Sequence, residues 1–180
     1  ADTHGTVLGI TDNSFAQPYI LLSASIPSDA GYFGERLNAA RRELVQVWKL
    51  RSARLEPRLP STDILGALLL ASQIFSQQPA NTSQKILLLF SDMRHHTHDL
   101  DLESPSAMFA LHRAKKASKI PPPFDLHQVQ VYALGVDGAG TPTAYWQSLE
   151  QFWEGYFQHS GASLNGFSAL RELPRFPNPN

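Results

Sequence analysis

The apolar positions of this chain alternate between short continuous runs and longer periodic stripes. Residues 85–90, Lys-Ile-Leu-Leu-Leu-Phe, form a run too short for a typical helix, and it predicts a strand covered on both faces. Similar runs predict strands over 6–11, 19–26 and 129–136. A short segment with Pro18 separates the first two of these, so we expect them to form an antiparallel hairpin.

Four stretches place apolar residues three and four positions apart, which predicts amphipathic helices over about 34–54, 62–76, 104–116 and 141–161. Thr62 or Asp63 can cap the second helix, and Ser104 before Pro105 is a favourable start for the third. The second helix is apolar around most of its circumference and should be deeply buried. Residues 167–173 are ambiguous, and residues 174–180 form a tail.

Helices that alternate with apolar strands predict an α/β fold. We expect a three-layer, Rossmann-like α/β/α sheet that is mostly parallel, with the hairpin at one edge. The length of 180 residues and the apolar fraction of 42% fit a single globular domain over 1–180.

Charge and composition exclude several classes of function. The net charge of −1 gives no reason to expect nucleic acid as a partner, and no apolar run approaches the roughly 20 residues that span a bilayer. The chain has no cysteine, which excludes disulfides and thiol catalysis. We therefore expect a soluble protein without a membrane span, in a compartment that composition leaves open.

A polar segment follows the strand 85–90. Asp92 lies at the carboxyl end of this strand, where open α/β sheets place their binding crevices, although it could equally accept hydrogen bonds from nearby loop amides. His95, His96 and His98 follow, with Asp99 and Asp101, and these imidazole and carboxylate side chains suggest zinc. Adjacent histidines do not easily converge on one ion, however, and no His-Glu-x-x-His sequence is present. We interpret the segment as an exposed loop beside the crevice.

The order of elements and two loops resemble the von Willebrand factor A domain over about residues 6–160. The matching residues are Thr62, in Ser-Thr-Asp-Ile-Leu-Gly-Ala-Leu, and Asp92, in Leu-Leu-Leu-Phe-Ser-Asp-Met. The resemblance implies that Thr62 and Asp92 help to hold Mg²⁺ or Mn²⁺ and that the cation receives an acidic side chain of a protein partner. Around these two ligands, the residues expected to contact the partner are Asp63, Arg94, His95, His96, His98 and Asp99.

The chain departs from the family at its main signature, Asp-x-Ser-x-Ser after the first strand. The nearest sequence, 12–16, reads Asp-Asn-Ser-Phe-Ala, and the second strand of the hairpin follows almost at once. We expect the domain to be incomplete at its N-terminus, lacking the first strand of the family. That strand would lie in preceding polypeptide or come from another chain, unless the fold is modified. An edge left open in this way invites pairing with a second copy or a complementing chain.

The sequence therefore predicts a non-enzymatic protein-interaction module resembling a von Willebrand A domain. The alternative is a Rossmann-like enzyme or binding protein for a small phosphorylated or carboxylated ligand. Residues 135–140, Gly-Val-Asp-Gly-Ala-Gly, lack the Gly-x-Gly-x-x-Gly spacing of a dinucleotide site, and no serine lies in a Gly-x-Ser-x-Gly elbow. Turnover of a small molecule would favour the alternative.

Overall fold

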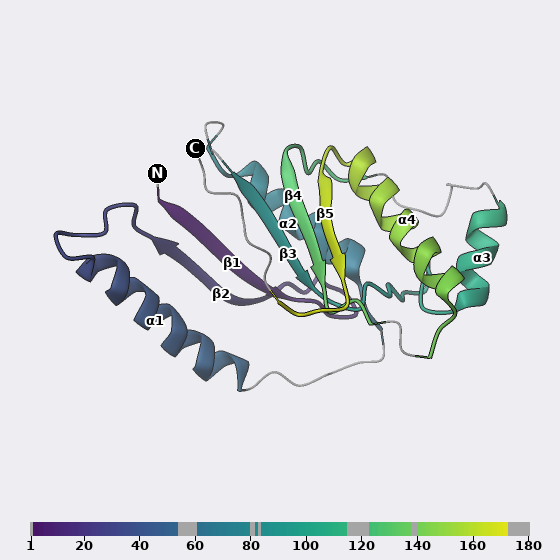
Figure 1. The fold of residues 1–180 in the computed structure, drawn as a ribbon, viewed down its shortest axis with the longest axis horizontal. Helices are drawn as coiled ribbons and strands as arrows, with labels where there is room; N and C mark the ends of the chain where they lie inside the picture. The colour runs from purple at the N-terminus through teal and green to yellow at the C-terminus, as the bar shows by residue number, and fades with distance from the viewer. Residues whose placement is uncertain are drawn as a thin grey trace.

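The computed structural model describes residues 2–53, 61–79, 82, 84–114, 123–137 and 140–172. Within these residues the elements follow the order β1 (Thr3–Gly9), β2 (Tyr19–Ile26), α1 (Glu35–Ser52), α2 (Ile64–Ser76), β3 (Lys85–Phe90), α3 (Pro105–Ala114), β4 (Val129–Leu134), α4 (Thr143–His159) and β5 (Ser163–Ser168) (Figure 1). The mixed α/β class expected from the sequence is confirmed.

The strands form two separate sheets rather than one. β1 and β2 pair antiparallel, with Thr3 opposite Ile26, which confirms the predicted hairpin. β3, β4 and β5 form a parallel sheet in that order. The sequence predicts that the hairpin pairs with the edge of the parallel sheet, and it predicts no strand at the position of β5. The structure differs at both points. The polar sequence of β5, Ser-Leu-Asn-Gly-Phe-Ser, has too little apolar character to indicate a strand.

The main core lies on one face of the parallel sheet. Val129, Val131 and Ala133 share this face because alternate residues of a strand point the same way, and all three are buried. The same cluster contains Leu65 and Leu68 of α2, and a set of α4 residues, namely Tyr145, Leu149, Trp153, Tyr156 and Phe157. Helices α2 and α4 therefore supply the cover of this face.

The opposite face of β3 is less well covered than the sequence predicted. Leu89 is buried against the core, but Ile86 and Leu88 are half-buried and Phe90 is 58% exposed. The expectation that this strand is covered on both faces is therefore wrong for the described residues. The deep burial predicted for α2 also holds only in part, because Leu69 and Leu70 are half-buried.

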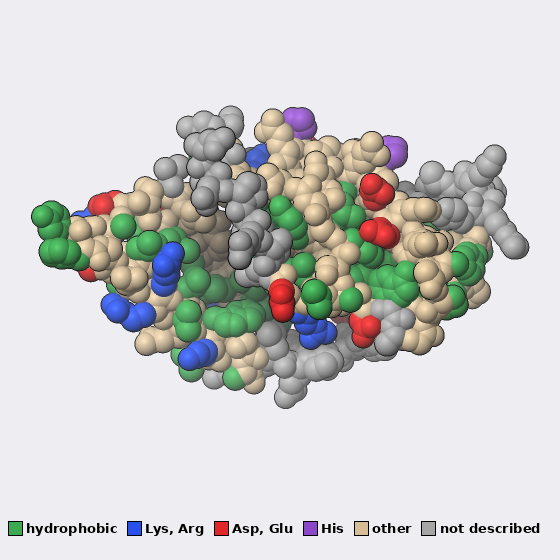
Figure 2. Space-filling model, in the orientation of Figure 1, with side chains coloured by type: hydrophobic (Ala, Val, Ile, Leu, Met, Phe, Trp, Pro, Cys, Tyr) green, Lys and Arg blue, Asp and Glu red, His purple; other side chains and the backbone are tan. Residues whose placement is uncertain are grey.

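Helix α1 lies beside β2, apart from the parallel sheet, and none of its residues is buried. The guanidinium of Arg51 donates to the carbonyl of Leu21 and ties the helix to β2. In the loop before α1, Tyr32 and Phe33 pack edge to face and are 90% and 86% exposed. Figure 2 shows hydrophobic side chains gathered at this end of the molecule. Among the described elements, α1 therefore packs mainly against β2 of the two-stranded sheet.

The helix boundaries follow the predicted caps. Asp63 caps α2 through a hydrogen bond from the Gly66 amide, and Ser104 Oγ accepts from the Ala107 amide at the start of α3. Gly161, with φ of +77°, follows the end of α4, as expected for a glycine that stops a helix. Residues 115–116 of the predicted third helix and the tail 174–180 lie outside the described residues. No helix in the described part of the chain is long and apolar enough to cross a membrane.

Candidate functional site at the carboxyl edge of the sheet

Three loops meet where β3 ends. The loop before α2 pairs with the loop after β3, because Thr62 and His96 exchange backbone hydrogen bonds of 3.0 Å in both directions. The loop after β1 joins them, since the Asp63 amide donates to the carbonyl of Thr11 at 2.7 Å. The predicted residues Thr62, Asp63 and His96 therefore belong to one surface, although more than thirty residues separate Asp63 from His96 in the sequence.

The carboxylate of Asp63 is committed to holding this arrangement. Oδ1 accepts from the Gly66 amide at 2.8 Å, and Oδ2 accepts from the Ser14 amide at 3.0 Å. The carboxylate also lies close over Gly66, where a Cβ atom would come within 2.0 Å of Oδ2. Asp63 was predicted to contact a partner, but its two oxygens serve as the helix cap and as the anchor of the β1–β2 loop.

His95 fills the N-terminal end of α2. Its side chain is 2% exposed, and Nδ1 accepts hydrogen bonds from the amides of Ile64 at 3.1 Å and Leu65 at 3.5 Å. These contacts require an unprotonated Nδ1, so the ring carries its proton on Nε2 and donates to Thr97 Oγ1 at 3.2 Å. Burial lowers the pKa of His95; the charge of Asp63 opposes this shift and that of His96 adds to it. His95 is thus a neutral structural residue that locks the loop to the helix.

The turn after β3 fixes the direction of Asp92 and Arg94. Asp92 Oδ1 accepts from the Arg94 amide at 3.1 Å, and Met93 adopts a positive φ of 61°. Arg94 points inward: its Nη2 donates to the carbonyl of Asp137 at 3.0 Å, and its guanidinium lies 5.7 Å from the centre of the Tyr145 ring. Its Nε is buried and has no hydrogen-bond partner among the described residues. Arg94 therefore connects the turn after β3 to the segment after β4, whereas the Asp92 side chain stays exposed.

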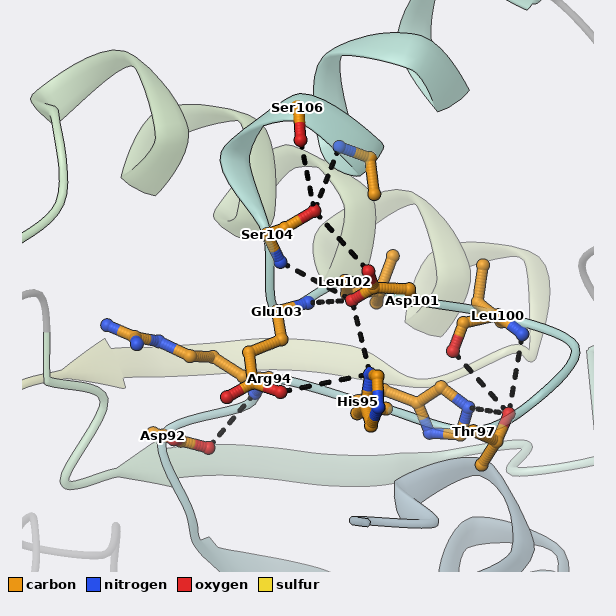
Figure 3. A network of polar contacts seen from close by, with 12 residues as sticks. Asp92, Arg94, His95, Thr97, Leu100, Asp101, Leu102, Glu103, Ser104 and Ser106 are labelled. Carbon is orange, nitrogen blue, oxygen red and sulfur yellow. Dashed lines mark hydrogen bonds and ion pairs between the residues drawn. The ribbon is translucent and has the colours of Figure 1, made fainter. Parts of the chain in front are cut away.

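Asp101, which was not among the predicted contact residues, organises the rest of the loop (Figure 3). Its carboxylate accepts from the amides of Glu103 at 2.8 Å and Ser104 at 3.3 Å, and lies 3.4 Å from His96 Nδ1. Burial works to raise the pKa of Asp101, but these hydrogen bonds together outweigh it and lower the pKa. The sequence signal for this role was an Asp two residues before Glu103, the spacing of an Asx turn, just ahead of the helix cap Ser104.

The outer side of the loop is polar and exposed. His98 Nδ1 lies 3.2 Å from Asp99 Oδ1, and the two side chains are 101% and 90% exposed. The Glu103 side chain is 55% exposed. We call the exposed carboxylates of Asp92, Asp99 and Glu103 the carboxylate rim. The loop therefore has a buried inner side and an exposed outer side. The interpretation of an exposed loop holds for His98 and Asp99 and is wrong for His95, whose burial also excludes the predicted contact with a partner.

The described residues do not by themselves make a convincing cation site. No group of three or more His, Cys, Asp or Glu side chains is placed to hold a metal ion within the described part of the chain. Thr62 and Asp92 would contribute one hydroxyl and one carboxylate, so an octahedral ion held by them alone would keep most of its water ligands. Ser14 lies near Asp63, but its hydroxyl is buried and bonded to the backbone of Thr11.

Comparisons with known proteins found no relative of this chain. No family model matches the chain, and neither a curated protein nor a solved structure was found to match it. The resemblance to the von Willebrand A domain therefore stays a prediction based on Thr62, Asp92 and the order of the elements.

Replacing Asp63 should loosen the site without removing the core. We expect Asp63→Ala to lower the free energy of unfolding by about 1–3 kcal/mol, because it removes the α2 cap and leaves the Ser14 amide without its acceptor. Asp99→Ala is the matched control, with an expected change within about 0.5 kcal/mol because Asp99 contacts only the exposed His98 among the described residues. Urea denaturation measures both; equal effects would contradict the anchoring role of Asp63.

Proposed function

We propose that this chain is a non-enzymatic protein-interaction module, similar in architecture to the von Willebrand A domain, that binds its partner at the carboxyl edge of the β3–β4–β5 sheet. The observation that carries the proposal is the backbone pairing of Thr62 with His96, which joins the loops before α2 and after β3 into one surface. In the three-layer arrangement that the resemblance implies, this edge is the binding face.

The chemistry of the rim suggests the character of the partner. Asp92, Asp99 and Glu103 are exposed, whereas the positive charge of Arg94 turns inward toward Asp137 and Tyr145. A surface with this charge attracts lysine and arginine side chains directly. An acidic side chain of a partner would instead need a bridging Mg²⁺ or Mn²⁺. Such an ion would require ligands in addition to Thr62 and Asp92 from outside the described residues.

The alternative, a binding protein or enzyme for a phosphorylated ligand, has weaker support. Phosphate groups are commonly held by free amides at the N-terminus of a helix. At α2 the amides of Ile64 and Leu65 donate to His95, and that of Gly66 donates to Asp63. The chain's own side chains thus occupy the place where a phosphate would bind, and this favours a surface for a protein partner.

Selection of peptides from a random display library tests the proposal. The selected peptides should bind the wild-type protein at least about tenfold more tightly than the triple variant Asp92→Ala, Asp99→Ala and Glu103→Ala, a difference of about 1.4 kcal/mol. The matched control is the triple variant Glu43→Ala, Glu150→Ala and Glu154→Ala, which removes the same charge from exposed positions on α1 and α4. Binding measured with EDTA and with Mn²⁺ separates direct from cation-bridged recognition.

Two results would contradict the proposal. Peptides that lose affinity equally for both triple variants would be attracted by the general charge of the protein and not by the rim. Peptides that bind both variants as well as the wild type would place the interaction surface elsewhere. Affinity lost with the rim variant and kept with the control is the result we expect.

A further inference from the structure

One side of helix α1 carries basic and apolar side chains and no carboxylate. Residues three and four positions apart share a side of a helix, and one such set runs along most of α1. This set, which we call the basic side, consists of Asn38, Arg41, Arg42, Val45, Trp48 and Lys49. Each of these side chains is exposed. The two acidic residues of the helix, Glu35 and Glu43, do not belong to the set.

The cations of the basic side have no acidic partner among the described residues. Arg36, elsewhere on the helix, pairs with Asp29 at 2.6 Å, but no such pair involves Arg41, Arg42 or Lys49 in the described part of the chain. Residues 29–52 hold five basic and three acidic side chains, although the whole chain has a net charge of −1. This surface therefore has a local excess of positive charge, which attracts anionic groups.

Two aromatic side chains project beyond the N-terminal end of α1. Tyr32 and Phe33 are 90% and 86% exposed, with ring centres 4.6 Å apart. Glu35 holds the loop in this shape, because its carboxylate accepts from the amides of Tyr32 at 3.2 Å and Phe33 at 2.8 Å. Figure 2 shows hydrophobic side chains at this tip and basic side chains along α1 in the same view. The loop is thus fixed in a conformation that presents both rings to solvent.

The combination fits an anionic lipid surface better than a protein partner. Between the cations of the basic side, Val45 is 49% exposed and Trp48 is 39% exposed. Helices that lie on membranes combine basic side chains, which attract anionic lipids, with apolar side chains that enter the headgroup region. Tyrosine and other aromatic side chains are favoured at this depth. A lipid surface accepts projecting rings without a shaped pocket, whereas a protein partner would need a pocket that matches Tyr32 and Phe33.

We propose that the basic side of α1 and the aromatic pair Tyr32 and Phe33 form a docking surface for a membrane that contains anionic lipids. Arg41, Arg42 and Lys49 contact the charged headgroups, and the two rings insert between them. No residue of this surface belongs to the carboxylate rim, so either proposal can fail without the other.

Co-sedimentation of the full chain with lipid vesicles tests the charged part of this surface. We expect binding to vesicles of phosphatidylcholine and phosphatidylserine mixed at about three to one, and at least about tenfold weaker binding to phosphatidylcholine alone. The double variant Arg41→Gln and Arg42→Gln should bind the mixed vesicles about tenfold more weakly. The matched control is Lys85→Gln with Arg171→Gln, which removes the same charge outside α1 and should change binding by less than about twofold.

A second pair of variants tests the aromatic tip. Tyr32→Ser with Phe33→Ser should weaken binding to the mixed vesicles at least about fivefold, because the inserting rings are lost. Both side chains are almost fully exposed, so the variant should keep the stability of the wild type. Leu170→Ser, at a residue that is 65% exposed after β5, is the control and should change binding by less than about twofold.

Four results would overturn the proposal. The first is binding to the mixed vesicles that is absent or no stronger than binding to phosphatidylcholine alone. The second is an equal loss for the two charge variants, which would mean attraction by the general charge of the protein. The third is binding that keeps its full strength without Tyr32 and Phe33. The fourth is retention on immobilised polyglutamate through Arg41 and Arg42 without binding to vesicles, which would identify an acidic protein as the partner.

Discussion

Replacing Trp153 by alanine is expected to lower the free energy of unfolding by about 3–5 kcal/mol, the cost of removing a large aromatic side chain from a packed core. Trp153 is fully buried and lies in contact with the rings of Phe152, Tyr156 and Phe157. Its Nε1 donates to the carbonyl of Met93 at 2.9 Å. The same side chain thus supports the core and the turn that carries the candidate site.

The link to Met93 gives this prediction a second part. Met93 has a positive φ, which costs energy in a residue with a side chain, and the surrounding contacts must hold it there. Trp153→Phe keeps most of the apolar bulk but loses the hydrogen bond, so we expect a smaller loss of about 1–2 kcal/mol. It should also increase hydrogen exchange in the segment 91–97. Trp48→Ala is the matched control on α1, where Trp48 is 39% exposed. Similar losses for Trp48→Ala and Trp153→Ala in urea denaturation would contradict this account of the core.

Replacing His95 by alanine is expected to lower the free energy of unfolding by about 2–4 kcal/mol. The change creates a cavity and leaves the buried amide of Ile64 without its acceptor. It also removes the hydrogen-bond partner of Thr97 and so releases the loop from α2. His98→Ala is the matched control, because its side chain is fully exposed and pairs with Asp99 only among the described residues. Its effect should stay within about 0.5 kcal/mol.

The same residue predicts a pH dependence of stability. Burial holds the folded-state pKa of His95 below its usual value of 6.5. At a pH between the lowered folded-state pKa of His95 and its pKa in the unfolded chain, the unfolded chain binds a proton that the folded chain does not. The free energy of unfolding should therefore fall as the pH falls through 6.5, and level off once the pH is below the folded-state pKa. The lowered pKa of Asp101 acts in a separate window, below 3.8.

Denaturation of the wild type, His95→Ala and His98→Ala between about pH 5 and 8 measures this contribution, a range in which histidine titrates. We expect the wild type and His98→Ala to lose stability in parallel toward acid pH, and His95→Ala to show a flatter dependence. A His95→Ala curve parallel to that of the wild type would show that His95 is not the residue responsible.

Local patterns in the sequence were sufficient for much of the fold. The apolar run at β3, the caps Asp63 and Ser104, and the stop at Gly161 each depend on residues close together in the chain. β5 was missed because its polar sequence becomes a strand only by pairing with Gln130–Leu134 of β4, a tertiary contact that overrides weak local preference.

The structural role of His95 could not be predicted from the residues next to it in the sequence. The two amides that it accepts from belong to a helix about thirty residues earlier, so the loop 93–101 read alone indicates only a polar, exposed segment. The histidines then separate into a buried structural residue, His95, and an exposed one, His98. The separation of the strands into two sheets likewise depends on strand pairing between distant segments, which local sequence patterns do not specify. The apolar sequence of β3 predicted coverage on both faces, yet the described residues leave part of one face and one edge open.

Hydrogen exchange of the wild-type protein with and without a peptide selected from the display library tests the central claim most directly. The account predicts protection at the carboxyl edge, in residues 62–63 and 92–103, with little change in α1. Protection confined to β1 and β3 would contradict the proposed rim, because the partner would then bind along the strands and not at their carboxyl edge. Protection confined to α1 and the loop with Tyr32 and Phe33 would contradict the account, because the partner would then bind the opposite end of the molecule.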